Sequence, residues 1–241
     1  MKKIVEWILT AKVLTFPRRY LVRIIARAMS VSRIGALYVL NLQDPETAKA
    51  VNLIAHIKRE TTMLLSDFCA YQLYTTVKKT RKVKGDIAEV GVYKGGSAKL
   101  ICEASPHKKI YLFDTFKGLP ELSINDKSSH FKKGDYATSF EIVKTYLKKY
   151  RNVIFCKGFF PATADFVKKN KFSFVHIDVD LYEATFNCLK FFYPRMNKGG
   201  VILGHDYPGA PGVKKAFDDF FRDKPQTIFE IPGTGQCLIS K

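Results

Sequence analysis

The sequence has few cysteines, and none of them stands at a spacing that binds zinc or builds a disulfide framework. Five are present, with no C-x-x-C pair among them. An odd, dispersed set is typical of reduced thiols in a cytoplasmic protein. We therefore expect a cytoplasmic protein whose cysteines are buried core residues. They are Cys69, Cys102, Cys156, Cys188 and Cys237.

Long apolar runs are also missing. No stretch approaches the roughly 20 apolar residues that a membrane span needs. The chain begins with Lys2 and Lys3, as a signal peptide would, but Glu6 and Lys12 interrupt its first apolar run and no small-residue cleavage site follows. We therefore predict neither secretion nor membrane insertion, and we find no internal repeat or low-complexity linker.

Acidic residues are in short supply. Forty Lys and Arg face 22 Asp and Glu, which gives a net charge of +18. Such a balance fits nucleic acid, an anionic membrane surface or anionic substrates. No recognised nucleic-acid-binding motif and no Asn-Pro-Pro-Tyr base-methylation motif is present, so we expect no nucleic acid partner. At 241 residues and 46% hydrophobic, the chain can bury a sizeable core.

The first 40 residues form a distinct basic segment, with eight Lys and Arg against the single acid Glu6. Aliphatic residues and Trp7, Phe16 and Tyr20 lie between the charges, which predicts an amphipathic helical extension broken at Pro17. One interpretation is a helix at the inner face of an anionic membrane, so that the acceptor is a lipid-linked glycan. The other is a segment packed on its own domain or on a second subunit of a homo-oligomer.

The rest of the chain, 41–241, predicts one α/β domain. A helical cap is expected over 45–80, with one helix beginning at Pro45 and another over Leu64–Val77. From Gly85 short apolar runs alternate with helical stretches, which predicts βαβ units and a parallel sheet over 85–241. The runs are Ile87–Val90, Ile110–Phe113, Val153–Cys156, Phe172–Ile177 and Val201–Leu203. The helical stretches are 97–104, 139–150, 162–169, 181–193 and 212–222. A closing antiparallel hairpin over Thr227–Ile231 and Gln236–Ile239 departs from the plain dinucleotide-binding pattern.

The first strand–helix turn predicts a cofactor site. Gly91 permits a tight turn, and Gly95 and Gly96 let backbone approach a ligand. The spacing is not G-x-G-x-x-G, and Glu89 would repel a pyrophosphate but attract an ammonium or sulfonium group. The loop also carries Tyr93 and Ser97 as candidate contacts.

The next two strand ends extend this site. Asp114 lies 25 positions after Glu89 and is expected to accept hydrogen bonds from both ribose hydroxyls, or else to cap the next turn. Thr115 and Phe116 follow it. After the third strand comes a turn with an adenine-packing candidate: Gly158, Phe159 and Phe160. Either phenylalanine is equally well explained as core.

Two further strand ends crowd acidic side chains together. Asp178 and Asp180 end the fourth strand, and His205 and Asp206 end the fifth. Ligands of open α/β sheets bind at this edge, and close carboxylates need a cation or a shared proton. These residues predict a site for a hard divalent ion such as Mg²⁺. A hydrogen-bonded turn network around Asp206 is the alternative.

Together these motifs resemble the macrocin O-methyltransferase family, which methylates sugars of macrolides. The matching segments are E-V-G-V-Y-K-G-G-S, D-T-F-K-G-L-P, K-G-F-F-P-A-T, H-I-D-V-D-L-Y-E-A-T and H-D-Y-P-G-A-P-G-V-K-K-A. The resemblance covers Thr61 to the C-terminus but not the basic segment. It implies a Rossmann-like class I methyltransferase fold with a seven-stranded sheet, S-adenosyl-L-methionine as cofactor, a Mg²⁺ ion and methyl transfer to a sugar hydroxyl.

The resemblance also implies roles for particular residues. Asp178 matches the family's aspartate that binds metal and acts as base. The family's Asp-Asp-Tyr triplet is His205-Asp206-Tyr207 here, so the imidazole departs from the pattern and leaves room for another divalent ion. A catechol or phenol O-methyltransferase is a rival with the same fold. A nucleic-acid-binding protein is a less favoured rival, because no recognised binding motif is present. A membrane scaffold is also less favoured, because the glycine loop and the acidic cluster are both intact.

Overall fold

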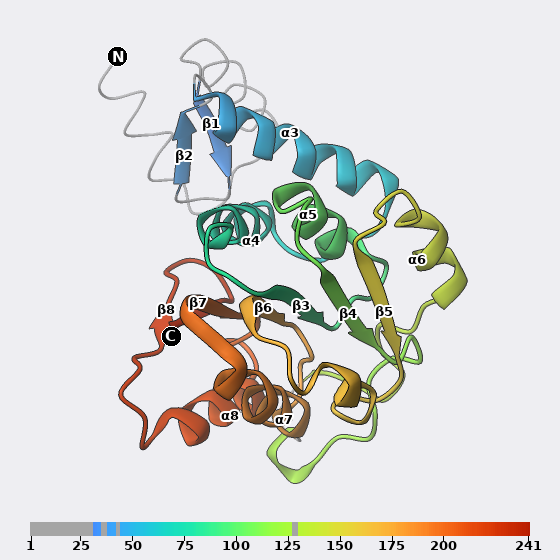
Figure 1. Ribbon diagram of the computed structural model, residues 1–241, viewed down its shortest axis with the longest axis vertical. Coiled ribbons are helices and arrows are strands. Elements are labelled where there is room, and N and C mark those ends of the chain that lie inside the picture. The colour runs from blue at the N-terminus through green and yellow to red at the C-terminus, as the bar shows by residue number, and fades with distance from the viewer. Residues whose placement is uncertain (1–30, 35–37, 42–43, 127–129) are drawn as a thin grey trace.

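The computed structural model describes residues 31–34, 38–41, 44–126 and 130–241 (Figure 1). Most of the predicted basic extension, residues 1–30, lies outside this range. Part of that prediction is wrong, because Val31–Ile34 (β1) and Tyr38–Asn41 (β2) form an antiparallel pair rather than a helix. Valine, isoleucine and tyrosine in these two runs favour extended backbone over helix.

A seven-stranded sheet forms the centre of the domain, as the sequence predicts. Its strands are β3 (Asp86–Val90), β4 (Ile110–Asp114), β5 (Val153–Lys157), β6 (Phe172–Ile177), β7 (Met196–Gly204), β8 (Phe229–Glu230) and β9 (Cys237–Ser240). Their order is β5-β4-β3-β6-β7-β9-β8, and β3 to β7 run parallel. The predicted terminal hairpin is confirmed, since β9 pairs antiparallel with both β7 and β8.

Helices cover both faces of this sheet (Figure 1). One face packs against α4 (Asp67–Thr80), α5 (Gly96–Ala104) and α6 (Phe140–Tyr146), and α3 (Pro45–Glu60) lies outside α4 and α5. The other packs against α7 (Tyr182–Phe192) and α8 (Pro211–Phe221). No helix in the described ranges has the length and apolarity to cross a bilayer. The fold class predicted from the sequence, an α/β sandwich with a mainly parallel sheet, is therefore confirmed.

Local sequence explains where these elements begin and which faces they bury. Asp44 caps α3 by accepting a hydrogen bond from the Thr47 backbone N–H at 2.8 Å, and Ser66 caps α4 through the Cys69 N–H at 3.1 Å. All five cysteines are free and buried, as predicted. Two helix predictions were too long. The stretch 139–150 is helical only over Phe140–Tyr146, and 162–169 forms a 3₁₀ helix at Ala162–Val167.

The turn after β3 fixes how closely two strand ends approach. Gly91 has φ +89°, and a Cβ on it would lie 1.8 Å from the carbonyl oxygen of Asp178. The Asp178 N–H donates to the Val90 carbonyl at 2.9 Å, so the ends of β3 and β6 are joined there. Only glycine permits both this φ and this contact.

We predict that Gly91→Ala destabilises the fold more than Gly134→Ala. Gly134 has a similar φ of +85°, but a Cβ added to it would meet no atom within 4 Å. Gly134→Ala should therefore cost only the roughly 1–2 kcal/mol of left-handed backbone. Gly91→Ala should cost about 1–3 kcal/mol more, because backbone must move. Urea unfolding measures both, and equal losses would contradict the close approach.

Candidate functional site

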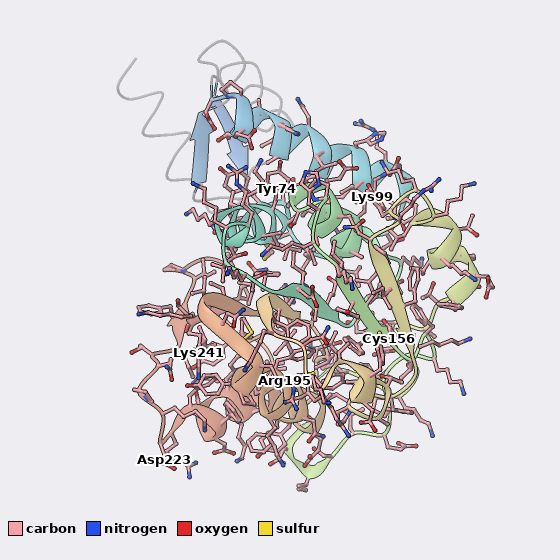
Figure 2. The ribbon with its side chains drawn as sticks, in the orientation of Figure 1. Tyr74, Lys99, Cys156, Arg195, Asp223 and Lys241 are labelled. Atoms are coloured by element: carbon pink, nitrogen blue, oxygen red, sulfur yellow. The ribbon has the colours of Figure 1, made fainter. Side chains whose placement is uncertain are left out.

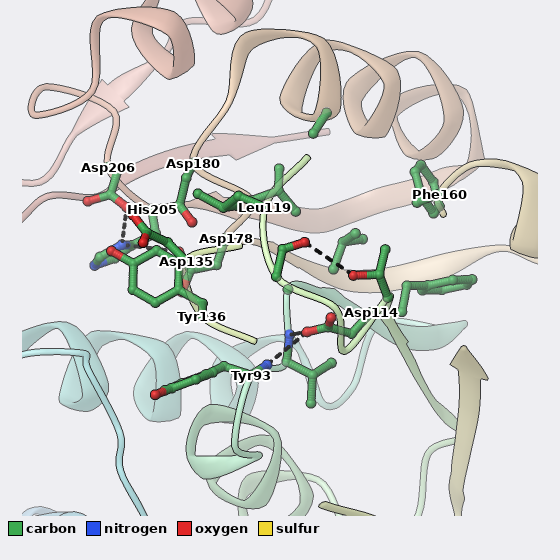
Figure 3. A pocket seen from close by; sticks show the side chains of 18 of the residues that line it. Tyr93, Asp114, Leu119, Asp135, Tyr136, Phe160, Asp178, Asp180, His205 and Asp206 are labelled. Atoms are coloured by element: carbon green, nitrogen blue, oxygen red, sulfur yellow. Dashed lines mark hydrogen bonds and ion pairs between the residues drawn. The ribbon is translucent and has the colours of Figure 1, made fainter. Parts of the chain in front are cut away.

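A cavity of about 630 Å³ opens at the carboxyl ends of the parallel strands (Figure 3). Asp114 and Tyr93 lie at one part of its wall, and the acidic side chains after β6 and β7 lie at another. Of the residues predicted for cofactor and metal, most line this cavity. They are Gly91, Tyr93, Ser97, Asp114, Thr115, Gly158, Phe159, Phe160, Asp178, Asp180, His205 and Asp206.

Asp114 organises the loop after β3. Its Oδ2 accepts hydrogen bonds from the backbone N–H groups of Val92 at 2.7 Å and Tyr93 at 2.8 Å. Its Oδ1 accepts from the Phe116 N–H at 2.7 Å. A carboxylate has about four acceptor positions. Three are used within the chain, which leaves one acceptor position for a ligand. The sequence prediction assumed two such positions, one for each ribose hydroxyl.

Glu89 is not on the cavity wall. Its side chain is fully buried between the sheet and α5, and its Oε1 lies 2.9 Å from Nδ1 of His176 on the neighbouring strand. Burial raises the pKa of Glu89, and the adjacent His176 offsets only part of that effect. Glu89 therefore supports the loop from beneath instead of facing a ligand directly.

Two other predicted contacts also lie away from the wall. Gly95, with φ +80°, starts α5 and packs against the side chains of α6. Phe116 is 5% exposed and packs on Phe140, with ring centroids 5.1 Å apart. Both shape the cavity from behind, and this was not apparent from the sequence because strand and loop residues alternate between wall and core.

The structure distinguishes Phe159 from Phe160, which the sequence left as equal candidates for packing on an adenine ring. Phe160 is partly buried, stacks on Phe192 with centroids 5.2 Å apart, and meets Phe113 edge-on at 5.3 Å. Phe159 is 60% exposed and lines the cavity beside Gly158. Phe159 is thus the ring that is free to cover a flat ligand, while Phe160 links the wall to the core.

The acidic cluster is compact. Nδ1 of His205 lies 3.3 Å from Oδ1 of Asp178 and 3.0 Å from Oδ2 of Asp206. One ligand atom from each of the three residues lies within 4.8 Å of the others. Asp180 lines the same cavity beside them (Figure 3). The sequence prediction that these two strand ends converge is confirmed by the geometry.

The charges in this cluster depend on one another. Burial acts to raise the pKa of Asp178, but the His205 imidazole outweighs burial and holds that pKa below its usual value. Burial, followed by the neighbouring Asp178 charge, raises the pKa of Asp180 well above its usual value. Burial acts to lower the pKa of His205, and the two carboxylates reverse that effect and raise it strongly.

The cluster fits a divalent cation. His205 Nδ1 is buried and makes no properly aligned hydrogen bond, although both carboxylates lie close to it. A cation between Asp178, His205 and Asp206 would satisfy this nitrogen and both carboxylates at once. Within the described residues, no other group of three such side chains comes together.

One side of the cavity was not indicated by the sequence. Tyr136 and Asp135 come from the loop between β4 and α6 and reach the acidic cluster (Figure 3). Burial and then the Asp180 and Asp206 carboxylates raise the pKa of Tyr136 to about 12. Asn187 of α7 also lines the cavity. No motif or periodicity marks Asp135 or Tyr136, because a loop that folds back over a sheet edge leaves no pattern in sequence.

Comparison with solved structures identifies the fold as that of class I methyltransferases. The O-methyltransferase NovP matches with a TM-score of 0.61 and 24% identity, over 70% of this chain and 78% of that one. The calicheamicin methyltransferase CalS11 matches with a TM-score of 0.63 and 18% identity, over 82% and 93% of the two chains.

The chain belongs to the macrocin-O-methyltransferase (TylF) family, whose family model matches residues 70–235. A relative in Streptomyces olivaceus, 8-demethyl-8-(2,3-dimethoxy-alpha-L-rhamnosyl)-tetracenomycin-C 4'-O-methyltransferase, is 29% identical over 171 residues. That match covers 64% of this chain and 65% of the relative. Mycinamicin III 3''-O-methyltransferase of Micromonospora griseorubida is 27% identical over 166 residues, 62% and 65% of the two. The chain thus spans just under two thirds of these relatives.

The buried Glu89–His176 pair beneath the loop after β3 gives a prediction. Glu89→Gln keeps the shape of the side chain and an oxygen that accepts from His176, so it should change the free energy of unfolding by about 1 kcal/mol or less. Glu89→Ala leaves a cavity and an unpaired buried imidazole, so it should cost about 3–5 kcal/mol. Urea unfolding of both variants tests this. Equal destabilisation would mean that the pair needs an ionised carboxylate.

Proposed function

We propose that this protein transfers a methyl group from S-adenosyl-L-methionine to a hydroxyl of a sugar-bearing acceptor, with the help of a divalent cation. One observation carries the proposal: the glycine loop held by Asp114 and the Asp178–His205–Asp206 cluster open into the same cavity. Family membership supports O-methyl transfer. The names of the relatives, which include methylation on a rhamnosyl group, support a sugar hydroxyl.

The cofactor would lie along the ends of β3, β4 and β5. Backbone at Gly91 and the loop residue Tyr93 would contact its amino-acid part, while the remaining acceptor position of Asp114 takes one ribose hydroxyl. Phe159 would cover the adenine. Loop and carboxylate are preorganised by the hydrogen bonds already described, so little ordering is needed when the cofactor binds.

The acceptor would bind at the other end of the cavity, against the acidic cluster. Asp178, His205 and Asp206 would hold the cation, and Asp180 lies within reach to assist. When bound, such a cation lowers the pKa of a substrate hydroxyl that it contacts. Asp178, whose own pKa is held low, would orient that hydroxyl or accept its proton.

The loop over the cluster would position the acceptor. The rings of Tyr93 and Tyr136 meet edge-on with centroids 5.9 Å apart, and Tyr136 also packs near Phe131 at 6.3 Å. Such an aromatic edge excludes water and gives a sugar ring an apolar surface to lie on. Holding hydroxyl and methyl donor in line supplies much of the acceleration that such a transfer needs.

A turnover screen tests the proposal as a whole. Purified protein is incubated with S-adenosyl-L-methionine and a panel of nucleotide sugars, glycosylated metabolites, glycolipids and catechols, with and without divalent metal. Formation of S-adenosylhomocysteine with a sugar acceptor supports the proposal, and turnover only with catechols would move the function to the phenol class. A cytoplasmic location, a homo-oligomeric state and a membrane role for residues 1–40 stay predictions from sequence.

We predict that Asp114→Ala weakens binding of S-adenosylhomocysteine by about 1–3 kcal/mol, because it leaves the loop N–H groups without their acceptor. Asp114→Asn should fall between wild type and Asp114→Ala, since an amide oxygen replaces only one carboxylate oxygen. Isothermal titration calorimetry measures the affinities. Asp223→Ala is the control, because Asp223, labelled in Figure 2, is an exposed acid that does not line the cavity. Unchanged affinity in Asp114→Ala would place the cofactor elsewhere.

We predict that the protein binds one divalent ion and that Asp178→Asn or Asp206→Asn weakens this binding. The loss should exceed the roughly 10–100-fold that changes to outer-shell partners cause, since each substitution removes a ligand. Titration with Mg²⁺, Mn²⁺ and Co²⁺, followed by calorimetry, measures it, with Asp165→Asn as an equally charged control. Chelator should abolish methyl transfer, and full activity in excess chelator would rule out the cation mechanism while leaving methyl transfer standing.

A further inference from the structure

The edge of the sheet opposite the cavity carries an uncompensated positive charge. Nine exposed basic side chains lie in the loops that lead into the parallel strands, in the first residues of β7 or at the end of β9, and we call them the basic edge. They are Arg81, Lys82, Lys84, Lys109, Arg151, Lys169, Lys171, Lys198 and Lys241. None of the nine forms an ion pair with any carboxylate of the described residues.

The absence of acids from the edge loops distinguishes the basic edge. Residues 81–85, 105–109, 147–152 and 168–171 contain no Asp or Glu. Some lysines elsewhere meet acids, as Lys58 does with Asp67 at 2.6 Å and Lys214 with Asp218 at 2.5 Å. Two acids flank these loops, and both have partners other than the nine basic residues. Asp165 pairs with Lys168 at 3.0 Å, and Asp86 accepts a hydrogen bond from Asn170.

Hydrogen bonds join the edge loops into one continuous rim. Asn152 Nδ2, next to Arg151, donates to the Lys108 carbonyl at 2.8 Å, and the Lys171 carbonyl accepts from the Asp86 N–H at 2.8 Å. Asn197 Nδ2 donates to the Lys84 carbonyl at 2.6 Å.

The rim ends at the start of β7. The Lys241 carbonyl accepts from the Gly199 N–H at 2.8 Å, and Arg195 Nε donates to the Lys168 carbonyl at 2.9 Å. Arg195 and Lys241 are both labelled in Figure 2. The nine cations are therefore held on one rigid edge that spans the parallel strands.

Helix α3 begins beside this same edge. Glu46, in the first turn of α3, pairs with Lys78 in the last turn of α4 at 2.6 Å, just before Arg81 and Lys82. Residues 1–43, which precede α3, contain eight Lys and Arg against the one acid Glu6, with aromatic and aliphatic residues between them.

We propose that the basic edge docks the protein on an anionic phospholipid surface. Seven of its nine residues are lysines. A lysine ammonium is a point charge that suits the diffuse negative potential of many headgroups, whereas arginine suits paired hydrogen bonds to one defined phosphate. The large exposed aromatic rings of the described residues, Phe159, Phe166 and Phe229, lie outside the edge loops. Bases of a nucleic acid would thus find no stacking platform.

Docking through this edge has a consequence for the site. The cavity lies at the carboxyl ends of the same strands, so it opens on the side away from the lipid. The acceptor then reaches the cavity from solution. The proposal is independent of the methyl-transfer chemistry, since it concerns side chains that do not line the cavity.

The test measures vesicle binding of the full chain. Vesicles of phosphatidylcholine with about one third phosphatidylglycerol are compared with pure phosphatidylcholine vesicles in a flotation assay at low and at physiological salt. The edge variant carries Lys84→Glu, Lys169→Glu and Lys198→Glu. The matched control carries Lys117→Glu, Lys132→Glu and Lys157→Glu, the same change in net charge at the opposite edge. Thermal melting confirms that both are folded.

Wild type should bind the anionic vesicles only. The edge variant should bind roughly 100-fold more weakly, at about fivefold for each lysine near the surface, while the control loses only a few-fold. Four results would overturn the proposal. They are no binding by wild type, equal losses in both variants, loss only when Arg18, Arg19 and Arg23 are replaced instead, and binding of the edge to RNA but not to vesicles.

Discussion

The contact between Gly91 and the Asp178 backbone is the constraint from which the geometry of the site follows. Because no Cβ intervenes, the turn after β3 lies directly against the end of β6, and the Asp178 N–H bonds to the Val90 carbonyl. The loop that is proposed to hold the cofactor and the strand end that carries the acidic cluster are thereby fixed relative to each other. In the proposed reaction the methyl donor and the accepting hydroxyl must meet in line. Backbone contacts, rather than flexible side chains, would position the two sites that hold them.

The two edges of the sheet carry side chains of opposite charge. At the carboxyl edge, Asp178, Asp180 and Asp206 crowd around His205 in a partly buried cavity, where close carboxylates need a cation. At the amino edge, exposed lysines and arginines stand without carboxylate partners. Within the described residues, acidic side chains are thus concentrated at the cavity edge of a chain whose net charge is +18.

Much of this arrangement was predictable from sequence, because parallel strands are marked by short apolar runs and place their last residues at one edge. Asp114, Asp178, His205 and Asp206 were found in that way. Burial beneath the loop was not predictable for Glu89, since its partner His176 lies 87 positions away on a neighbouring strand. Tyr136 was missed because it reaches the cavity from an irregular loop, and the β1–β2 pair was missed because its amphipathic pattern also suits a helix.

A crystal structure with S-adenosylhomocysteine and Mn²⁺ would show directly whether cofactor and cation share the cavity. We expect the nucleoside between Asp114 and Phe159, with an anomalous Mn²⁺ peak bounded by Asp178, Nδ1 of His205 and Asp206 in the same cavity. A nucleoside bound outside this cavity would contradict the shared site. So would a cavity that binds the nucleoside while His205 remains paired with both carboxylates and no metal peak lies between them.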